Sequence, residues 1–433
     1  MRHHGRDPSL AKIAPFNAVH YNNLRFGNEV SRFVAPPYDV IDRGLEKRLK
    51  EDRLNITHLT LGNEGDKYAT AAKRLRRWLN DGVLVSDPNK SLYLYEQTYQ
   101  GADGVVRVRT GIVAIVKLEE PSSGVILPHE NTIPKHKTDR MALMSAIRGD
   151  SEHIFMLFDD PTGDVQRTID SCRKSAEMLG FIDSGGVHHR IVRIADDATV
   201  AKISSLLASQ RMLIADGHHR YETALEFRDR MRKGRTPQGE EPADFVLATL
   251  VSFRDPGLVI NPTHRLVKGV DDETLKGLRG RLSVDFSLRD FDSPELLLLA
   301  LNDAPSTAFG VWCPSAGLIT LAEQKRNDLS EPLGGLSVFV LQEKVLKPML
   351  GFTAEMLERN ANIDYAKGLE AARSKLASRE HTLCFLLKAP TPGQVMEVAE
   401  DGLKMPQKST YFYPKIWSGT LLYLFGEHDS YEQ

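Results

Sequence analysis

A short apolar run followed by a dense polar cluster occupies residues 212–232, whose sequence is M-L-I-A-D-G-H-H-R-Y-E-T-A-L-E-F-R-D-R-M-R. The apolar residues 212–215 are typical of a buried strand, because they form a brief run bounded by a glycine. From Tyr221 onward, apolar residues recur at the spacing of an amphipathic helix. The sequence therefore predicts a strand, a sharp polar turn and a helix, so the fold must combine strands with helices.

The turn between these two elements consists of Asp216, Gly217, His218, His219 and Arg220. A helix begins with free backbone N–H groups and partial positive charge, and both attract anions. Gly217 lets the backbone approach a ligand, and Arg220 offers a fork of donors that suits phosphate. Asp216 supplies a carboxylate for a metal ion or a proton, although it also suits a helix cap. We interpret the turn as an anion site, against the alternative of a solvated first helical turn.

The size, charge and cysteine content of the chain narrow the classes of protein to consider. Its 433 residues, 41% of them hydrophobic, suffice for two domains or one elaborated large domain. The net charge of −2 gives no broad attraction to nucleic acid. No apolar run reaches the length of a membrane span, and the first residues lack the apolar core of a signal peptide. Three widely spaced cysteines form no disulfide framework, which indicates a reducing compartment, so we expect a cytoplasmic protein. From its charge and its short apolar runs, we expect it to bind neither nucleic acid nor membranes.

A second cluster of ionisable residues lies between two apolar elements within residues 127–157. Its members are His129, Glu130, Lys135, His136, Lys137, Asp139 and Arg140. A glutamate beside basic groups is a candidate general base, so we assign that role to Glu130. Lys135, Lys137 and Arg140 are candidate phosphate ligands, and His129 is a candidate substrate ligand. The alternative is an exposed, charged connector.

Two further turns offer candidate substrate-binding residues. Two prolines stiffen the chain before Tyr38 and Asp39, which would present these side chains on a rigid loop. Near the end of the chain, the hydroxyls of Ser409 and Thr410 gather with two lysines, Lys408 and Lys415, in a turn that suits phosphate or carboxylate. A capped proline turn and an exposed hairpin edge are the respective structural alternatives.

Alternating patterns along the chain predict an α/β fold with mixed α+β character. They indicate strands over 91–99, 105–118, 154–158, 186–192, 245–253 and 383–387, and helices over 67–79, 140–148, 164–179, 196–209, 273–282, 294–302, 336–349, 365–378 and 391–400. We expect an α/β core carrying the site over 1–270, an inserted or second subdomain over 271–352, and a return to the core over 353–433. Neither a P-loop nor a G-x-G-x-x-G fingerprint is present.

Five motifs, in order along the chain, are similar to those of the domain of unknown function 1015 family. They are A-P-P-Y-D-V-I at 35–41, H-E-x-T at 129–132, K-x-D-R at 137–140, D-G-H-H-R-Y-E-T-A-L at 216–225 and M-P-Q-K-S-T-Y-F at 405–412. The likeness spans essentially the whole chain, and the motif at 216–225 is the most specific of the five.

The D-G-H-H-R turn also resembles the phosphate-binding turn of the ParB/sulfiredoxin-like fold, in which some members are kinases of free L-serine. This resemblance implies a ParB/sulfiredoxin-like core elaborated by additional α/β segments. It further implies that Gly217, His218, His219 and Arg220 hold donor phosphates, with Asp216 beside the metal or the hydroxyl. Glu130 as the base rests on its local chemistry, not on a matched motif. The segment 271–352 has no counterpart in the small kinases that we can name.

These observations favour a small-molecule kinase that transfers a phosphoryl group from ATP or ADP, with Mg²⁺, to the hydroxyl of a free amino acid. L-serine is a candidate acceptor. A metal-dependent hydrolase is a second hypothesis, with ligands drawn from His129, Asp216, His218, His219 and His264. A nucleotide-binding regulator without catalysis is a third. The expected partners are a nucleotide and a small hydroxyl metabolite, and the sequence leaves open whether the chain forms a homodimer.

Overall fold

The computed structural model describes residues 11–62, 65–101, 103–131, 134–208 and 210–426. The chain packs into two compact units. Unit 1 contains residues up to 128, residues 132–258 and residues from 414 onward, whereas unit 2 contains 129–131 and 259–413. The predicted segments 1–270, 271–352 and 353–433 stay a prediction about domains, because contacts within one chain do not show which segments fold independently.

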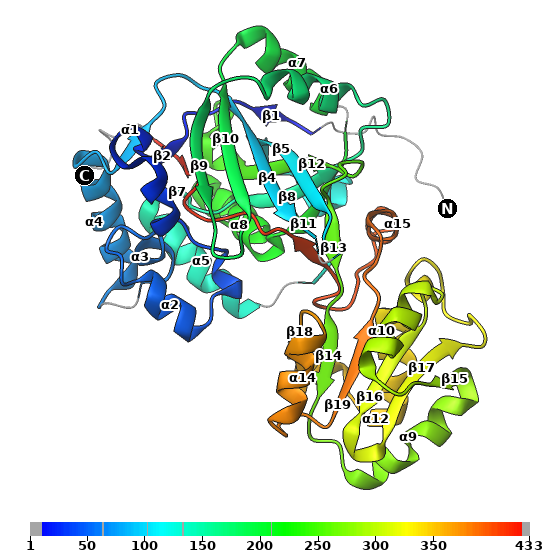
Figure 1. Ribbon diagram of the computed structural model, residues 1–433. Helices are drawn as coiled ribbons and strands as arrows, with labels where there is room; N and C mark the ends of the chain where they lie inside the picture. The colour runs from blue at the N-terminus through cyan, green and yellow to red at the C-terminus, as the bar shows by residue number, and fades with distance from the viewer. Residues whose placement is uncertain (1–10, 63–64, 102, 132–133, 209, 427–433) are drawn as a thin grey trace. The chain divides into compact units, whose positions relative to one another are not determined.

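Unit 1 is built around a nine-stranded mixed sheet (Figure 1). The strands of unit 1 are β1 Ile13–Ala14, β2 Val19–Tyr21, β3 Leu84–Ser86, β4 Leu92–Gln100, β5 Val106–Lys117, β6 Ile126–Pro128, β7 Gly149–Asp150, β8 Ile154–Phe158, β9 Glu177–Ile182, β10 His188–Ile194, β11 Met212–Asp216, β12 Phe245–Ser252 and β21 Tyr423–Leu424. The large sheet follows the order β6-β11-β8-β12-β5-β4-β10-β9, and β1 pairs with β5. Every residue of β12 is buried, since this strand lies between two neighbours deep in the sheet.

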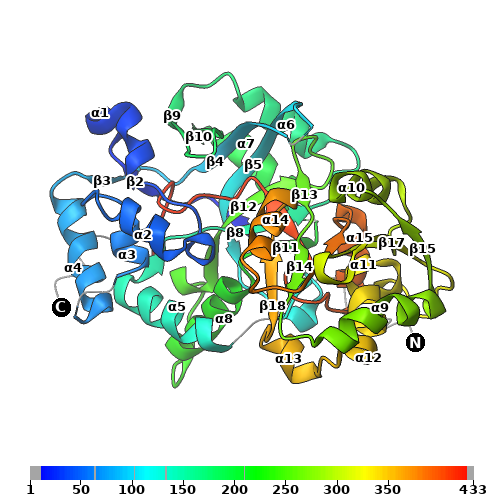
Figure 2. The ribbon, with the colours of Figure 1, turned by 60° about the horizontal axis from the view of Figure 1, so that its bottom comes forward.

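Unit 1 also contains α-helices and short 3-10 helices. They are α1 Asn23–Phe26, η1 Gly27–Arg32, η2 Tyr38–Val40, α2 Arg43–Leu49, α3 Thr57–Thr60, α4 Lys67–Asn80, η3 Pro121–Ser123, α5 Pro134–Ile147, α6 Asp164–Cys172, α7 Asp197–Ala208, α8 His218–Arg232 and η4 Pro242–Asp244. Helix α5 packs against both α8 and α4, as Figure 2 shows. This packing brings the second ionisable cluster of the sequence next to the helix that follows the polar turn.

Unit 2 has its own six-stranded antiparallel sheet, in the order β15-β17-β16-β19-β14-β18. Its elements are β13 Val259–Asn261, β14 His264–Val267, α9 Asp272–Asp285, β15 Phe286–Asp290, α10 Pro294–Asp303, β16 Phe309–Cys313, η5 Pro314–Ala316, β17 Leu318–Gln324, η6 Leu333–Gly335, α11 Ser337–Leu341, the π-helical η7 Gln342–Leu346, α12 Lys347–Leu350, α13 Ala354–Glu358, β18 Ile363–Ala366, α14 Leu369–Ala377, β19 Leu383–Leu387, α15 Pro392–Glu400 and β20 Tyr411–Tyr413. Leu297 and Leu301 of α10 pack with Leu321 and Leu386 of the sheet and are fully buried. A separate ribbon pairs β13 with β20.

The mixed α/β class predicted from the sequence is confirmed, whereas several element boundaries were wrong. The helix expected over 164–179 ends at Cys172, and β9 begins at Glu177. Leu179 and Phe181 alternate with more exposed neighbours and pair with β10, so strand pairing overrides the helical pattern there. The helix expected over 140–148 begins earlier, at Pro134, because proline is tolerated in the first turn of a helix.

Predictions from the sequence also concerned disulfide bonds and membrane spans. All three cysteines are free and buried. Among the helices that the structure describes, none combines the length and the apolar character needed to cross a bilayer.

Candidate functional site

The turn from β11 to α8 depends on a glycine. Gly217 is the N-cap residue of α8 and has a φ of 94°, in the left-handed region that glycine favours. A Cβ atom at this position would lie 3.1 Å from Arg220 Nε and 3.2 Å from its Cζ. Glycine therefore allows both the sharp turn and the return of the Arg220 guanidinium over it.

Asp216 lies at the end of β11 and has two positively polarised partners. One carboxylate oxygen accepts a hydrogen bond from the backbone N–H of Gly217 at 2.8 Å. The other accepts from Lys415 Nζ at 2.8 Å. Because Gly217 is the cap residue, Asp216 orients the turn and is not the helix cap.

Arg220 points back from the first turn of α8 into buried surroundings. Its Nη1 donates to the backbone oxygen of His153 at 2.6 Å, and its Nη2 lies 3.9 Å from an Asp216 carboxylate oxygen. Burial alone would lower the pKa of Arg220, but the nearby carboxylates, Glu152 foremost and then Asp216 and Asp39, raise it above its ordinary value. The side chain is thus held as a cation among acidic groups.

Arg140 of α5 is the second cation of this region and is buried, with 7% of its surface exposed. Its Nη2 donates to the backbone oxygen of Thr60 at 2.8 Å, and its guanidinium lies 4.4 Å from the centre of the Tyr38 ring. Its Nη1 lies 3.6 Å from a Glu152 carboxylate oxygen but has no hydrogen-bond partner. Arg140 therefore keeps one buried N–H donor for a further acceptor.

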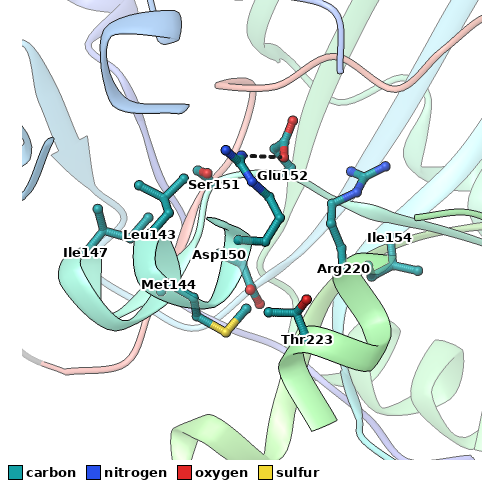
Figure 3. Close-up of a pocket in the computed structure, with 11 residues that line it drawn as sticks. Leu143, Met144, Ile147, Asp150, Ser151, Glu152, Ile154, Arg220 and Thr223 are labelled. Atoms are coloured by element: carbon teal, nitrogen blue, oxygen red, sulfur yellow. Dashed lines mark ion pairs between the residues drawn. The ribbon is translucent and has the colours of Figure 1, made fainter. Parts of the chain in front are cut away.

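Glu152 is the acidic residue that faces both arginines. Its carboxylate accepts hydrogen bonds from the Tyr38 backbone N–H at 3.2 Å and from Ser418 Oγ at 2.9 Å. It is 6% exposed. Figure 3 draws its ion pair with Arg140 as a dashed line. Glu152 thus connects Tyr38 of the proline-stiffened loop and Ser418 of the C-terminal segment with the two arginines.

A cavity of about 30 Å³ lies beside the two arginines (Figure 3). Its lining residues are Arg140, Leu143, Met144, Ile147, Gly149, Asp150, Ser151, Glu152, Ile154, Arg220 and Thr223. This volume accommodates about two water molecules, so it suits a single small group and not a whole nucleotide. Polar groups on one side and the apolar face of α5 on the other make it a suitable inner end of an anion site.

Asp150 in the wall of this cavity is a buried carboxyl. One oxygen accepts from the Leu247 backbone N–H at 3.0 Å, and in Figure 3 the side chain lies toward Thr223. Burial raises the pKa of Asp150 to about 7, even though Leu247 N–H and Arg220 act in the opposite direction. The cavity therefore contains a carboxyl that exchanges its proton near neutral pH.

The other predicted residues of unit 1 have varied surroundings. Lys137 of α5 forms an ion pair with Glu222 of α8. Asp39 is exposed, and its charge acts on Arg220. His218 is buried, whereas His219 is half-buried and its backbone oxygen accepts from Thr223. The loop at 38–39 and the turn at 216–220 therefore belong to one region of unit 1.

The remaining predicted residues gather in unit 2. Glu130 Oε1 accepts from the Ser409 backbone N–H at 3.1 Å and lies 3.5 Å from Thr410 Oγ1. His129 Nε2 lies 3.0 Å from the same Thr410 hydroxyl. Lys408 has a φ of 56°, an unusual backbone for a residue that is not glycine. The structure thus brings the two distant motifs at 129–130 and 408–410 together.

Arg265 of β14 forms hydrogen bonds with the backbone of the loop that carries Lys408. Its Nη2 donates to the backbone oxygens of Gln407 at 3.0 Å and Lys408 at 3.2 Å. The side chain is 4% exposed, and its guanidinium lies 5.5 Å from the centre of the Tyr365 ring. Arg265 therefore holds the backbone on both sides of the strained Lys408.

A model of the family described as "Protein of unknown function (DUF1015)" matches residues 13–340. The chain belongs to this family. The matched residues include the ionisable cluster at 129–140 and the polar turn at 216–220, and therefore also Arg140, Glu152 and Arg220. Lys415 and the loop at 408–410 lie beyond the matched residues of this DUF1015 chain.

Several solved structures are distantly similar to this DUF1015 protein. A free serine kinase variant in complex with AMP is 13% identical, with a TM-score of 0.36 over 70% of this chain and 87% of that chain. A conserved hypothetical protein from Pyrococcus furiosus is 13% identical, with a TM-score of 0.36 over 71% and 92% of the two chains. A C-terminally truncated SbnI from Staphylococcus aureus is 12% identical, with a TM-score of 0.35 over 74% and 89%. Among curated proteins, none matches the chain.

Two residues that the sequence did not single out, Glu152 and Asp150, lie in the candidate site of this DUF1015 protein. Glu152 and Asp150 precede the buried strand β8, and a carboxylate next to an apolar run was the only available signal for them. Lys415 stands in the turn that suggested Lys408, but nothing in the pattern linked it to Asp216. Thr132 and the side chains of Lys135 and His136 lie outside the described residues.

The hypothesis of a His/Asp metal centre does not fit the described residues. Within those ranges, no three histidine, cysteine, aspartate or glutamate side chains form a group that could hold a metal ion. His129 and His264 belong to unit 2, whereas Asp216, His218 and His219 belong to unit 1. Whether Glu130 acts together with Arg220 stays a prediction, because these residues also belong to different units.

Proposed function

We propose that this protein is a small-molecule kinase that transfers a phosphoryl group from ATP or ADP to the hydroxyl of a free amino acid, with L-serine as a candidate acceptor. The observation that carries the proposal is a pair of arginines, Arg220 in the first turn of α8 and Arg140 in α5, which both lie close to Glu152. Arg220 is held as a cation, and Arg140 keeps an N–H without a partner beside a small cavity. Phosphoryl transfer depends mainly on positioning and charge neutralisation, which such cations supply.

In this proposal the donor phosphates lie against Gly217, His218, His219 and Arg220, with Arg140 and Lys137 as further cations. The resemblance of the D-G-H-H-R turn to the ParB/sulfiredoxin-like phosphate-binding turn supports this placement. Glu130 takes the proton of the acceptor hydroxyl, while Tyr38, Asp39, His129 and residues 408–410 contact the substrate. The proton passes to the Glu130 carboxylate as the hydroxyl oxygen bonds to phosphorus and the donor's bridging oxygen leaves.

A magnesium ion would neutralise charge on the phosphates, as in other phosphoryl-transfer enzymes. Asp216 is the carboxylate in the turn itself, and its two oxygens accept hydrogen bonds from the Gly217 N–H and Lys415 Nζ. In this proposal Asp216 would be a protein ligand to Mg²⁺, and phosphate oxygens would be the principal ligands.

The test is a turnover assay that detects phosphoserine by NMR, with ATP or ADP, Mg²⁺ and free amino acids as substrates. Arg220→Lys keeps the charge but loses the fork of donors, and we expect turnover to fall on the order of a hundredfold. Arg230→Ala is the matched control, because Arg230 is an exposed residue of the same helix. Product formation by wild type that Arg220→Lys leaves unchanged would contradict the site.

Two other results separate this proposal from its rivals. Nucleotide binding without product from any amino acid would favour a non-catalytic regulator. A tightly held, stoichiometric transition metal in the purified protein would favour a hydrolase.

A further inference from the structure

A second and larger cavity, of about 490 Å³, lies in unit 1 and shares no lining residue with the cavity beside Arg220. It is bounded by the segment after β1, the loop after β3, β5 and the strand β21 with the residues that follow it. We propose that this cavity binds a small aromatic anion, meaning a one- or two-ring system that carries a carboxylate, sulfonate or phosphate.

The size of the cavity favours a small ligand. Binding sites for small molecules commonly measure about 300–1,000 Å³, and this cavity falls within that range. It is far larger than the space of about 30 Å³ beside Arg220. One or two fused rings with a charged substituent fit such a volume.

Three aromatic residues give the cavity a rigid wall. The rings of Phe16 and Tyr423 meet edge to face with centres 5.7 Å apart, and those of Tyr423 and Phe425 do so at 5.4 Å. All three side chains are buried, and the Tyr423 hydroxyl donates to the backbone oxygen of Pro242 at 3.0 Å. Because these rings are already fixed, a planar ligand would bind without ordering them.

The charge among the described residues that line the cavity is positive. Lys90 is the cationic side chain among the described residues that line the cavity, and no acidic residue is among them. It is exposed and forms no ion pair or hydrogen bond with any described residue. The nearby carboxylate of Asp87 is engaged by Tyr93 at 2.7 Å and lies 3.6 Å from Arg193.

An amide in the lining adds a place for a polar substituent. Asn17 donates its side-chain N–H to the backbone oxygen of Asp87 at 2.9 Å, which fixes the orientation of its carbonyl oxygen. An anionic ring compound would thus find aromatic faces, a cation in Lys90 and a fixed polar group in Asn17. A neutral apolar compound would use only the first of these.

The test compares two probes of nearly equal shape, 1-naphthalenesulfonate and the neutral 1-naphthalenesulfonamide, by calorimetry on the full chain. We expect the sulfonate to bind saturably and Lys90→Gln to weaken it roughly tenfold, while leaving the sulfonamide unchanged. Lys276→Gln, on the exposed face of α9 in unit 2, is the matched control and should change neither affinity. Ser86→Trp adds a ring at an exposed lining position and should block both probes.

The proposal is overturned if the sulfonate shows no saturable binding, or if Lys90→Gln weakens neither probe. It is also overturned if Ser86→Trp leaves both affinities intact, because the probes then bind elsewhere. Arg220→Lys should not alter probe binding, so a failure here is distinguishable from a failure of the proposed kinase site.

Discussion

Lys415 Nζ lies 2.8 Å from Asp216 Oδ2, although the two residues are 199 positions apart in the sequence. Their side chains are only 13% and 20% exposed, so water screens the pair weakly. The contact fastens the end of the chain to the β11–α8 turn and fixes the direction of the Asp216 carboxylate. It thereby connects a segment beyond the family match to the centre of the candidate site.

A double-mutant cycle with Asp216→Asn and Lys415→Met measures this contact. Because the pair is largely buried, we expect a coupling of about 0.5–3 kcal/mol in the free energy of unfolding. The exposed pair Arg77–Asp81 serves as the control, and its coupling should stay below about 0.5 kcal/mol. Urea unfolding followed by circular dichroism supplies the values, and equal coupling in the two pairs would contradict the prediction.

Glu152→Gln removes the charge that faces Arg140 and Arg220 but keeps an oxygen that can accept from Tyr38 and Ser418. We expect a lower melting temperature, because the buried guanidinium of Arg140 and the largely buried guanidinium of Arg220 lose their shared carboxylate. Inorganic phosphate should raise the melting temperature of this variant more than that of wild type, since the anion replaces the missing charge. Equal stabilisation of both proteins by phosphate, measured by thermal shift, would argue against an anion site here.

Gly217→Ala forces a Cβ into the left-handed turn and toward the Arg220 guanidinium. The backbone strain alone costs about 1–2 kcal/mol, so the free energy of unfolding should fall by at least that amount. Nucleotide affinity, measured by calorimetry, should fall as well because Arg220 is displaced. Gly280→Ala is the control: Gly280 lies within α9, an added Cβ would meet nothing within 4 Å, and the change should stabilise the protein slightly.

Asp150→Asn should change how stability depends on pH. Burial raises the folded-state pKa of Asp150 to about 7, above its unfolded value, so the folded protein loses stability as pH rises from about 4 through 7. The neutral variant escapes this loss. It should therefore be more stable than wild type at pH 9 and similar to it at pH 5, as urea unfolding at the two pH values would show. A difference that does not vary with pH would mean that Asp150 does not titrate in this range.

Glu130→Gln tests the base of the proposed reaction. Glutamine still accepts from the Ser409 N–H, so the 408–410 loop should keep its place while the proton acceptor is lost. We expect kcat to fall about 10²- to 10⁴-fold with little change in KM. Glu130→Asp, which shortens the side chain but keeps the carboxylate, should recover part of the rate. An unchanged kcat in Glu130→Gln, at wild-type stability, would remove Glu130 from the catalytic step.

The sequence predicted the local features of this fold well where short-range patterns dominate. The strand, the turn and the helix that follows depend on neighbouring residues only, and all three form in the predicted order. The predicted bounds were wrong, because the strand includes Asp216 and the helix already begins at His218, which leaves Gly217 alone as the turn. The prediction was wrong where a partner strand decides the outcome, as at Glu177–Ile182, which pairs with β10 instead of extending a helix. Propensity is a weak guide once hydrogen bonding to a distant strand is available.

The amino-acid sequence by itself determined the polar turn, because an apolar run, a glycine and a helical repeat each direct the backbone over only a few residues. Tertiary structure alone decided what surrounds that turn. Lys415 reaches Asp216 and Glu152 faces Arg220 only because the sheet and α5 bring separate segments together. Such long-range contacts leave no periodic trace in a single sequence, since the pairing of two charges depends on packing and not on spacing.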